Sequence, residues 1–128
     1  MRTGLIFTLS ILFFSLLANA SELEKFTPEK FMAAQADGKR IALQYHADWC
    51  PTCKKQQATL STLMKNPKYK EIVFMQANYD KETEFKEKHM VKGQSTFILF
   101  KGDMEVSRSQ GETDKSSLMG QLDKLSMK

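Results

Sequence analysis

The sequence predicts an α/β fold with a central mixed sheet of about four to five strands and helices on both faces. Segments with helical periodicity alternate with short apolar segments in the order helix, strand, helix, strand, helix, strand, strand, helix. No repeat, low-complexity tract or linker interrupts this order, so residues 21–128 are expected to form one domain.

The first three elements lead to the only two cysteines of the chain. Thr27 suits the N-cap of a helix, Pro28 suits its first position, and Gly38 suits its end. Residues 41–47 are expected to form a strand, which runs directly into a helix over residues 50–65.

The later elements continue the alternation. They are expected to be a strand at 72–75, a helix at 81–90, two strands at 96–100 and 104–109, and a helix that begins at Thr113 or Asp114. The two adjacent strands are joined by a tight turn at Gly102 and must pair as an antiparallel hairpin, which makes the sheet mixed.

Residues 1–20 have the pattern of a secretory signal peptide. Arg2 gives a positive start, residues 5–17 are mostly apolar, and Ala18-Asn19-Ala20 is a small-residue cleavage site. The apolar run is shorter than the about 20 residues that a membrane-spanning helix needs, although a retained amino-terminal anchor is the alternative. The protein is therefore expected to be cut after Ala20 and to be periplasmic or secreted.

The charge pattern bears on the partners. The formal net charge is +4, and the lysines are interleaved with glutamates along the chain. This pattern is typical of a solvated surface and not of a nucleic-acid interface. We therefore expect no nucleic-acid partner. We also expect no cofactor and a monomer.

Cys50 and Cys53 have Cys-x-x-Cys spacing. Such a pair can form a structural disulfide, bind a metal together with other ligands, or cycle between dithiol and disulfide. A structural disulfide here would close a very small loop, and the entropic stabilisation from a disulfide grows with loop length. The chain has no second cysteine pair to complete a metal site, so redox chemistry is the preferred interpretation.

The two cysteines are expected to differ in acidity. Cys50 lies where a strand ends and a helix begins, so unpaired backbone N–H groups and the helix dipole should stabilise its thiolate. Cys53 lies one turn further into the helix and should remain a thiol. Pro51 fits the first turn because no N–H is needed there, and Thr52 adds no charge.

The residues around the pair resemble the thioredoxin family. The resemblance rests on Ala47-Asp48-Trp49-Cys50-Pro51-Thr52-Cys53-Lys54, Asn78-Tyr79-Asp80, Gly93-Gln94-Ser95-Thr96-Phe97-Ile98-Leu99-Phe100-Lys101-Gly102 and Gly111. It implies the thioredoxin fold and thiol-disulfide exchange with protein thiols or disulfides through a transient mixed disulfide. In that exchange Cys50 would be the nucleophile and Cys53 the resolving thiol. For the direction of electron flow, the preferred interpretation is a reductase or electron carrier that receives electrons from a membrane donor.

One departure from the family concerns Ser95, which stands where a cis-proline is usual. Because a non-proline cis bond costs about 2.5–4 kcal/mol, the Gln94–Ser95 bond is expected to be trans. The Ser95 hydroxyl could donate a hydrogen bond to the Cys50 thiolate. The alternative is a serine that is merely tolerated in a surface loop.

Two further departures concern proton handling. Gln44 stands where the family commonly buries an acid, and Gln76 replaces a frequent lysine. Amides can bond to each other but cannot accept protons at ordinary pH. His46, four residues before Cys50, is therefore the candidate to pair with the thiolate or take a proton. Its alternative is a flat core residue with one hydrogen bond.

Trp49 is expected to form a partly exposed wall beside the sulfurs. Two other classes of function remain open. One is a metal-handling protein that binds zinc or copper through Cys50, Cys53 and His46. The other is a non-catalytic binding module on the same fold.

Overall fold

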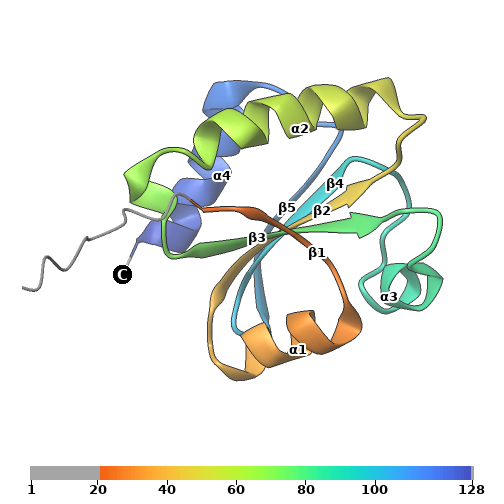
Figure 1. The fold of residues 1–128 in the computed structure, drawn as a ribbon, viewed down its shortest axis with the longest axis horizontal. Coiled ribbons are helices and arrows are strands. Elements are labelled where there is room, and N and C mark those ends of the chain that lie inside the picture. The colour runs from red at the N-terminus through yellow and green to blue at the C-terminus, as the bar shows by residue number, and fades with distance from the viewer. Residues whose placement is uncertain (1–20, 128) are drawn as a thin grey trace, which may run out of the picture.

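A computed structural model describes residues 21–127, so the expected signal peptide at 1–20 lies outside the described residues. Five strands form one sheet in the order β1-β3-β2-β4-β5 (Figure 1). They are β1 (Leu23–Lys25), β2 (Arg40–His46), β3 (Ile72–Asn78), β4 (Thr96–Lys101) and β5 (Met104–Gln110). β1 and β2 run parallel to β3, whereas β4 is antiparallel to both β2 and β5, which confirms the mixed sheet.

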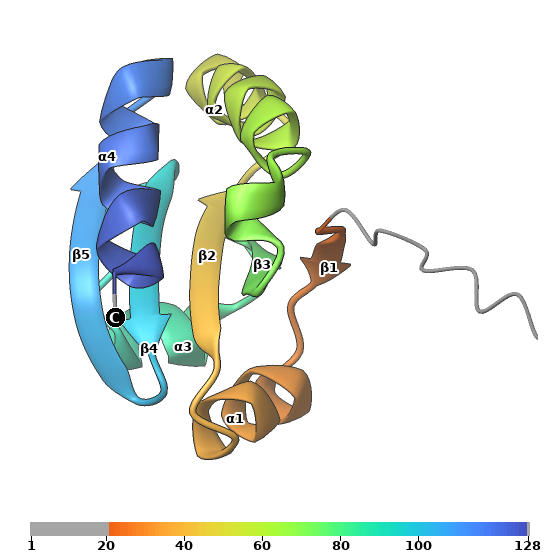
Figure 2. The same ribbon diagram turned by 90° about the vertical axis from the view of Figure 1, so that its left-hand side faces the viewer.

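Helices cover both faces of this sheet, as the sequence predicts (Figures 1 and 2). They are α1 (Pro28–Ala36), α2 (Pro51–Leu63), α3 (Thr83–Lys88), α4 (Lys115–Ser126) and the short 3-10 helix η1 (Pro67–Tyr69). The helices α2 and α4 lie on one face, and α1 and α3 lie on the other. Within residues 21–127, no helix combines the length and the apolar character needed to cross a membrane.

The central strand β2 contributes to the cores on both faces. Ile41, Leu43 and Tyr45 belong to the core under α1 and α3, where phenylalanine rings pack edge to face. Ala42 points the other way and joins the core under α2 and α4. Because both faces are covered, β2 is a rigid support that ends at His46, shortly before Cys50.

Local capping explains where two helices begin. The Thr27 hydroxyl accepts a hydrogen bond of 3.2 Å from the backbone N–H of Lys30 and so caps α1. Gly38, just after this helix, has φ +67°, a conformation that suits glycine. Asp114 caps α4 in the same way through the N–H of Ser117.

The sequence pattern did not predict β1 and η1, which have three residues each and are too short to show a period. The predicted strand at 72–75 is too short, because β3 continues to Asn78 through the polar Gln76. The predicted helix at 81–90 is too long, because α3 spans only Thr83–Lys88. The Asn78 side chain accepts hydrogen bonds from the backbone of Asp80 and Lys81, and this turn delays the start of α3.

Candidate active site

Cys50 is the N-cap of α2. Its backbone is extended, and its Sγ accepts a hydrogen bond of 3.1 Å from the backbone N–H of Cys53. Pro51 takes the first helical position, where no N–H is needed. Both cysteines are free thiols and both are buried. The sulfur of Cys50 therefore lies against the unpaired N–H groups of the helix start, as the sequence indicates.

Ser95 lies beside both sulfurs. Its Oγ is 3.0 Å from the Sγ of Cys53 and 3.5 Å from the Sγ of Cys50. The residue is only 1 % exposed, so the alternative of a surface-loop serine is wrong. No peptide bond among the described residues is cis, so the Gln94–Ser95 bond is trans, as expected. The contact with Cys50 is the one expected from the sequence, but Cys53 is closer.

Ser95 has an unusual backbone conformation. Its φ is +61°, a region that residues other than glycine rarely adopt and that costs about 1–3 kcal/mol. Its N–H donates to the carbonyl of Tyr45 at 2.9 Å, and its carbonyl accepts from the N–H of Gly111 at 3.0 Å. The side-chain amide of Gln56 donates to the same carbonyl at 3.1 Å. These three bonds hold the strained residue in place beside the sulfurs.

The two thiols differ in acidity. Burial opposes ionisation of Cys50, but hydrogen bonds from the side chains of Cys53 and Ser95 and from the backbone N–H groups of Cys53 and Thr52 outweigh it and lower its pKa. Burial is the main cause that raises the pKa of Cys53, and its hydrogen bond to Cys50 raises it further. Cys50 is therefore the sulfur that ionises first, and Cys53 keeps its proton.

A network of glutamine side chains lies behind the sulfurs. The Nε2 of Gln44 donates to the Oε1 of Gln56 at 2.9 Å, and the Nε2 of Gln76 donates to the Oε1 of Gln44 at 3.0 Å. The Nε2 of Gln76 also reaches the Oε1 of Gln57 at 2.8 Å. Gln44 and Gln56 are both buried. Position 44, where the thioredoxin family commonly has an acid, thus holds a neutral hydrogen-bonding group in this chain.

Sequence reasoning missed Gln56 and Gln57. Gln56 lies three residues after Cys53 on the same helix, so the two side chains share a face of α2. That spacing is the signal that could have found it. Gln56 is the residue that joins the network to the Ser95 loop.

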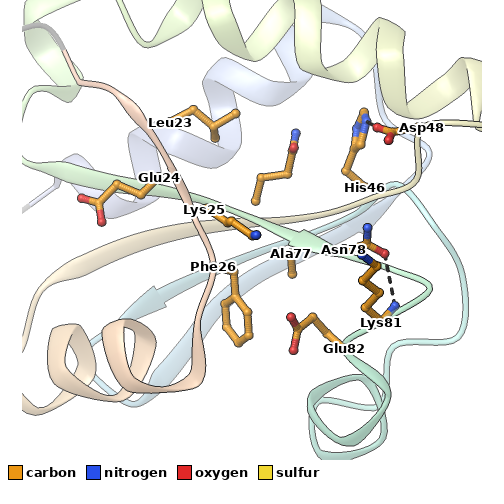
Figure 3. Close-up of a pocket in the computed structure, with 11 residues that line it drawn as sticks. Leu23, Glu24, Lys25, Phe26, His46, Asp48, Ala77, Asn78, Lys81 and Glu82 are labelled. Atoms are coloured by element: carbon orange, nitrogen blue, oxygen red, sulfur yellow. Dashed lines mark hydrogen bonds and ion pairs between the residues drawn. The ribbon is translucent and has the colours of Figure 1, made fainter.

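His46 has no hydrogen bond to either sulfur within the part of the chain that the structure describes. Its Nε2 lies 3.2 Å from the Oδ1 of Asp48, and its Nδ1 is buried without a partner. The imidazole lines a separate cavity of about 440 Å³ near the edge strand β1 (Figure 3). The expected pairing with the Cys50 thiolate is therefore absent, and the geometry is closer to the alternative of a packed histidine with one polar contact.

The geometry bears on the metal-handling alternative. Among residues 21–127, no three His, Cys, Asp or Glu side chains are grouped closely enough to hold a metal ion. Because the nearest polar partner of His46 is Asp48, the two cysteines lack a third ligand from this residue. The described part of the chain therefore offers no preformed zinc or copper site built from three of these side chains.

An open cleft of about 330 Å³ gives access to one of the two sulfurs. Its lining residues are Cys50, Thr52, Gln94, Ser95, Gln110 and Gly111. Cys53 is not among them. Trp49 is 59 % exposed, which agrees with the expected exposure, and its Nε1 donates a hydrogen bond of 2.8 Å to the Oδ2 of Asp80. A partner can therefore approach Cys50 but not Cys53.

Comparisons with known proteins agree with the fold described above. The thioredoxin family model matches residues 22–124. The thioredoxin of Chlamydia trachomatis is 30% identical over 96 residues, which cover 75% of this chain and 91% of that protein. Thioredoxin-1 of Drosophila yakuba is 29% identical over 90 residues, covering 70% of this chain and 82% of that protein. The crystal structure of Trxlp from Edwardsiella tarda EIB202 superposes with a TM-score of 0.76 at 35% identity, covering 79% of this chain and 98% of that one.

Proposed function

The chain belongs to the thioredoxin family, and from this premise we propose that it reduces disulfides of exported proteins through Cys50 and Cys53. It is a thioredoxin-type thiol-disulfide oxidoreductase, a class that acts on protein thiols and disulfides. The observation that carries the assignment of roles is the asymmetry of the two sulfurs. Cys50 has the lowered pKa and lines the cleft, whereas Cys53 is buried with a raised pKa.

The proposed cycle has two displacements. The Cys50 thiolate attacks one sulfur of a substrate disulfide, forms a mixed disulfide and releases the other substrate sulfur as a thiolate, which takes a proton from water. Cys53 then loses its proton and attacks the Sγ of Cys50. A disulfide forms between Cys50 and Cys53, and the second substrate sulfur leaves. Two electrons pass from the protein dithiol to the substrate disulfide.

The cleft and Trp49 support a protein substrate. The cleft at Cys50 is open to solvent and not an enclosed cavity. Thr52, Gln94 and Ser95 line this cleft together with Cys50, so a chain bound at Cys50 would lie against them. The exposed indole of Trp49 offers a flat apolar surface beside it.

The cell compartment and the direction of electron flow form a further part of the proposal. The signal-peptide pattern of residues 1–20 supports export to the periplasm or beyond the cell. Such compartments are oxidising, so a reductase there must be reduced again by a donor. A membrane protein that carries electrons across the membrane is the class of donor that fits. We propose that the protein works as a monomer.

Trapping with Cys53→Ala tests the nucleophile and the substrate class together. Without the resolving thiol, mixed disulfides at Cys50 should accumulate and run as higher bands on non-reducing gels. Cys50→Ala is the matched control and should trap nothing. Adducts that form equally well on Cys50→Ala, or that are absent from Cys53→Ala, would contradict the proposed roles.

The compartment needs its own measurement. The mature protein should begin at Ser21 and be found in the exported fraction of the cells that make it. Amino-terminal sequencing of the purified protein checks this expectation. A mature chain that keeps residues 1–20 and stays in the cytosol would overturn the export proposal without affecting the chemistry.

A further inference from the structure

The Ser95 hydroxyl bridges the two thiols. A hydroxyl group donates one hydrogen bond and can accept two. In the reduced protein the O–H of Ser95, 3.5 Å from the Sγ of Cys50, can donate to the Cys50 thiolate, which also accepts from the S–H of Cys53. In the mixed disulfide Cys50 is no longer a thiolate, so the S–H of Cys53 is free to donate to the Oγ of Ser95, 3.0 Å away. One hydroxyl thus connects the proton that must leave Cys53 with the side of the pair where the substrate binds.

The neighbouring groups are poor proton acceptors for Cys53. Its second contact is the backbone carbonyl of Tyr45 at 4.0 Å, which does not take a proton. Gln44 and Gln56 are neutral amides. Within the described residues, neither sulfur has a hydrogen bond to a carboxylate or an imidazole, since His46 contacts Asp48 instead. Cys53 must nevertheless lose its proton when it resolves the mixed disulfide.

We propose that the Ser95 hydroxyl relays the proton of Cys53 to the leaving sulfur of the substrate in the resolving step. This inference rests on the proposed dithiol cycle. The Sγ of Cys53 attacks the Sγ of Cys50 as its proton passes to the Oγ of Ser95. The bond between Cys50 and the substrate sulfur breaks, its electron pair goes to that sulfur, and the original hydroxyl proton of Ser95 goes there too. The products are the Cys50–Cys53 disulfide and a neutral substrate thiol, and Ser95 is unchanged.

The position of the cleft supports delivery of this proton. Ser95 and Cys50 both line the cleft, whereas Cys53 does not. A substrate sulfur bonded to Cys50 therefore lies on the side where Ser95 faces the cleft. Ser95 contacts the buried thiol through its Oγ and is also one of the residues that line this space.

The strained backbone of Ser95 also supports a defined role. Its φ of +61° is held by the bonds to Tyr45, Gly111 and Gln56. Strained residues persist where the surrounding structure fixes them, and they cluster at active sites. The hydroxyl is therefore preorganised between the sulfurs, which a proton relay requires.

Two disulfide probes and two variants test the relay. The aromatic disulfide dithiobis(nitrobenzoic acid) gives a leaving thiolate that is stable without a proton, whereas glutathione disulfide gives an alkyl thiolate that is not. Rapid mixing with the reduced protein, followed by acid quench and mass spectrometry, measures the formation and the decay of each Cys50 adduct separately. The variants are Ser95→Ala and Ser95→Gly, and glycine adopts φ +61° without strain.

Loss of the hydroxyl should slow the decay of the glutathione adduct by about 100-fold, the size expected for losing a positioned proton carrier. The decay of the aromatic adduct should slow much less. Ser95→Ala and Ser95→Gly should behave alike. The control is Ser109→Ala, which removes a hydroxyl on β5 that bonds to Gln121 and should decay like the wild type.

Three results would overturn the relay. The glutathione adduct could decay as fast in both variants as in the wild type. Both probes could be slowed equally, which would place the effect on Cys53 and not on the leaving sulfur. Ser95→Gly could restore the rate that Ser95→Ala loses, which would trace the effect to the backbone. A wild-type protein that neither probe oxidises to the Cys50–Cys53 disulfide would instead overturn the proposed function.

Discussion

The side-chain nitrogen of Gln56 donates a hydrogen bond of 3.1 Å to the backbone carbonyl of Ser95. The same nitrogen donates to the carbonyl of Glu112 at 2.8 Å, and its amide oxygen accepts from Gln44. One buried side chain on the helix that carries Cys53 therefore fixes the loop that carries Ser95. This contact couples the position of the hydroxyl to the position of the sulfurs.

Replacing Gln56 by Leu should lower the free energy of unfolding by about 1–3 kcal/mol, because the two carbonyls lose their buried donor. It should also slow thiol exchange, since Ser95 is then held by two bonds and not three. Urea unfolding and the rate of disulfide reduction measure the two effects. Gln57→Leu is the matched control, because Gln57 bonds to Gln76 and not to the loop. Equal effects of both variants would contradict this role for Gln56.

Replacing Gln44 by Glu should make stability fall with rising pH. The new carboxyl group would be buried against the Oε1 of Gln56, so its protonated form would be favoured and its pKa raised. Above about pH 4.3, the ordinary pKa of a glutamate, the unfolded chain then binds fewer protons than the folded one. The stability should keep falling as the pH rises, until the pH exceeds the pKa of the new carboxyl group in the folded protein.

Urea unfolding of Gln44→Glu at several pH values measures this loss. The wild-type protein is the control, because an amide at position 44 does not titrate. If the difference in stability between the two proteins is the same at about pH 4 as at about pH 8, the buried environment assigned to position 44 is wrong.

The fold was predictable because its signals are local. Thr27, Gly38 and the apolar runs of β2 and β4 mark their elements by chemistry that needs no partner. β1 was not predictable, because its three residues become a strand only by pairing with β3. The same holds for β3, whose polar end at Gln76 is stabilised by Gln44 across the sheet.

The features of the site that depend on neighbouring residues in the sequence were predictable, but the contacts between distant segments were not. The helix start at Cys50 follows from the neighbouring residues, and the difference between the two thiols follows from that placement. The direction of the His46 side chain does not follow from its distance in sequence to Cys50, because Asp48 two residues later takes its Nε2. The contact between Ser95 and Cys53 joins residues far apart in the chain, so no local pattern shows it.

Replacing His46 by Phe should leave the pKa of Cys50 and the rate of disulfide exchange almost unchanged. The imidazole contacts Asp48 and lines a separate cavity (Figure 3), and it has no hydrogen bond to either sulfur within the described residues. Alkylation of Cys50 by iodoacetamide as a function of pH measures the pKa. Ser95→Ala serves as the positive control, because it removes a contact with the sulfur. A shift as large in His46→Phe as in Ser95→Ala would restore histidine to the proton chemistry.

The same titration should show wild-type Cys50 ionising below about 8.5, the ordinary pKa of a free cysteine. Burial alone would raise the pKa, so a low value requires the hydrogen bonds from Cys53, Ser95 and the helix start. Ser95→Ala should raise the midpoint without returning it to the ordinary value, because the backbone N–H of Cys53 remains. A titration midpoint of wild-type Cys50 that lies above about 8.5 by more than about half a pH unit would contradict the thiolate assignment.

The reduced protein should become more stable as pH rises from the folded-state pKa of Cys50 to about 8.5. In this window the folded state has lost the proton of Cys50 while the unfolded chain still holds it, so a rise in pH favours folding. The raised pKa of Cys53 acts in the opposite direction, but only above about 8.5, where the unfolded thiol ionises. Urea unfolding measures the slope, and the oxidised protein, which has neither thiol, is the control. A reduced protein whose stability changes in parallel with that of the oxidised form would show that Cys50 has no lowered pKa in the folded state.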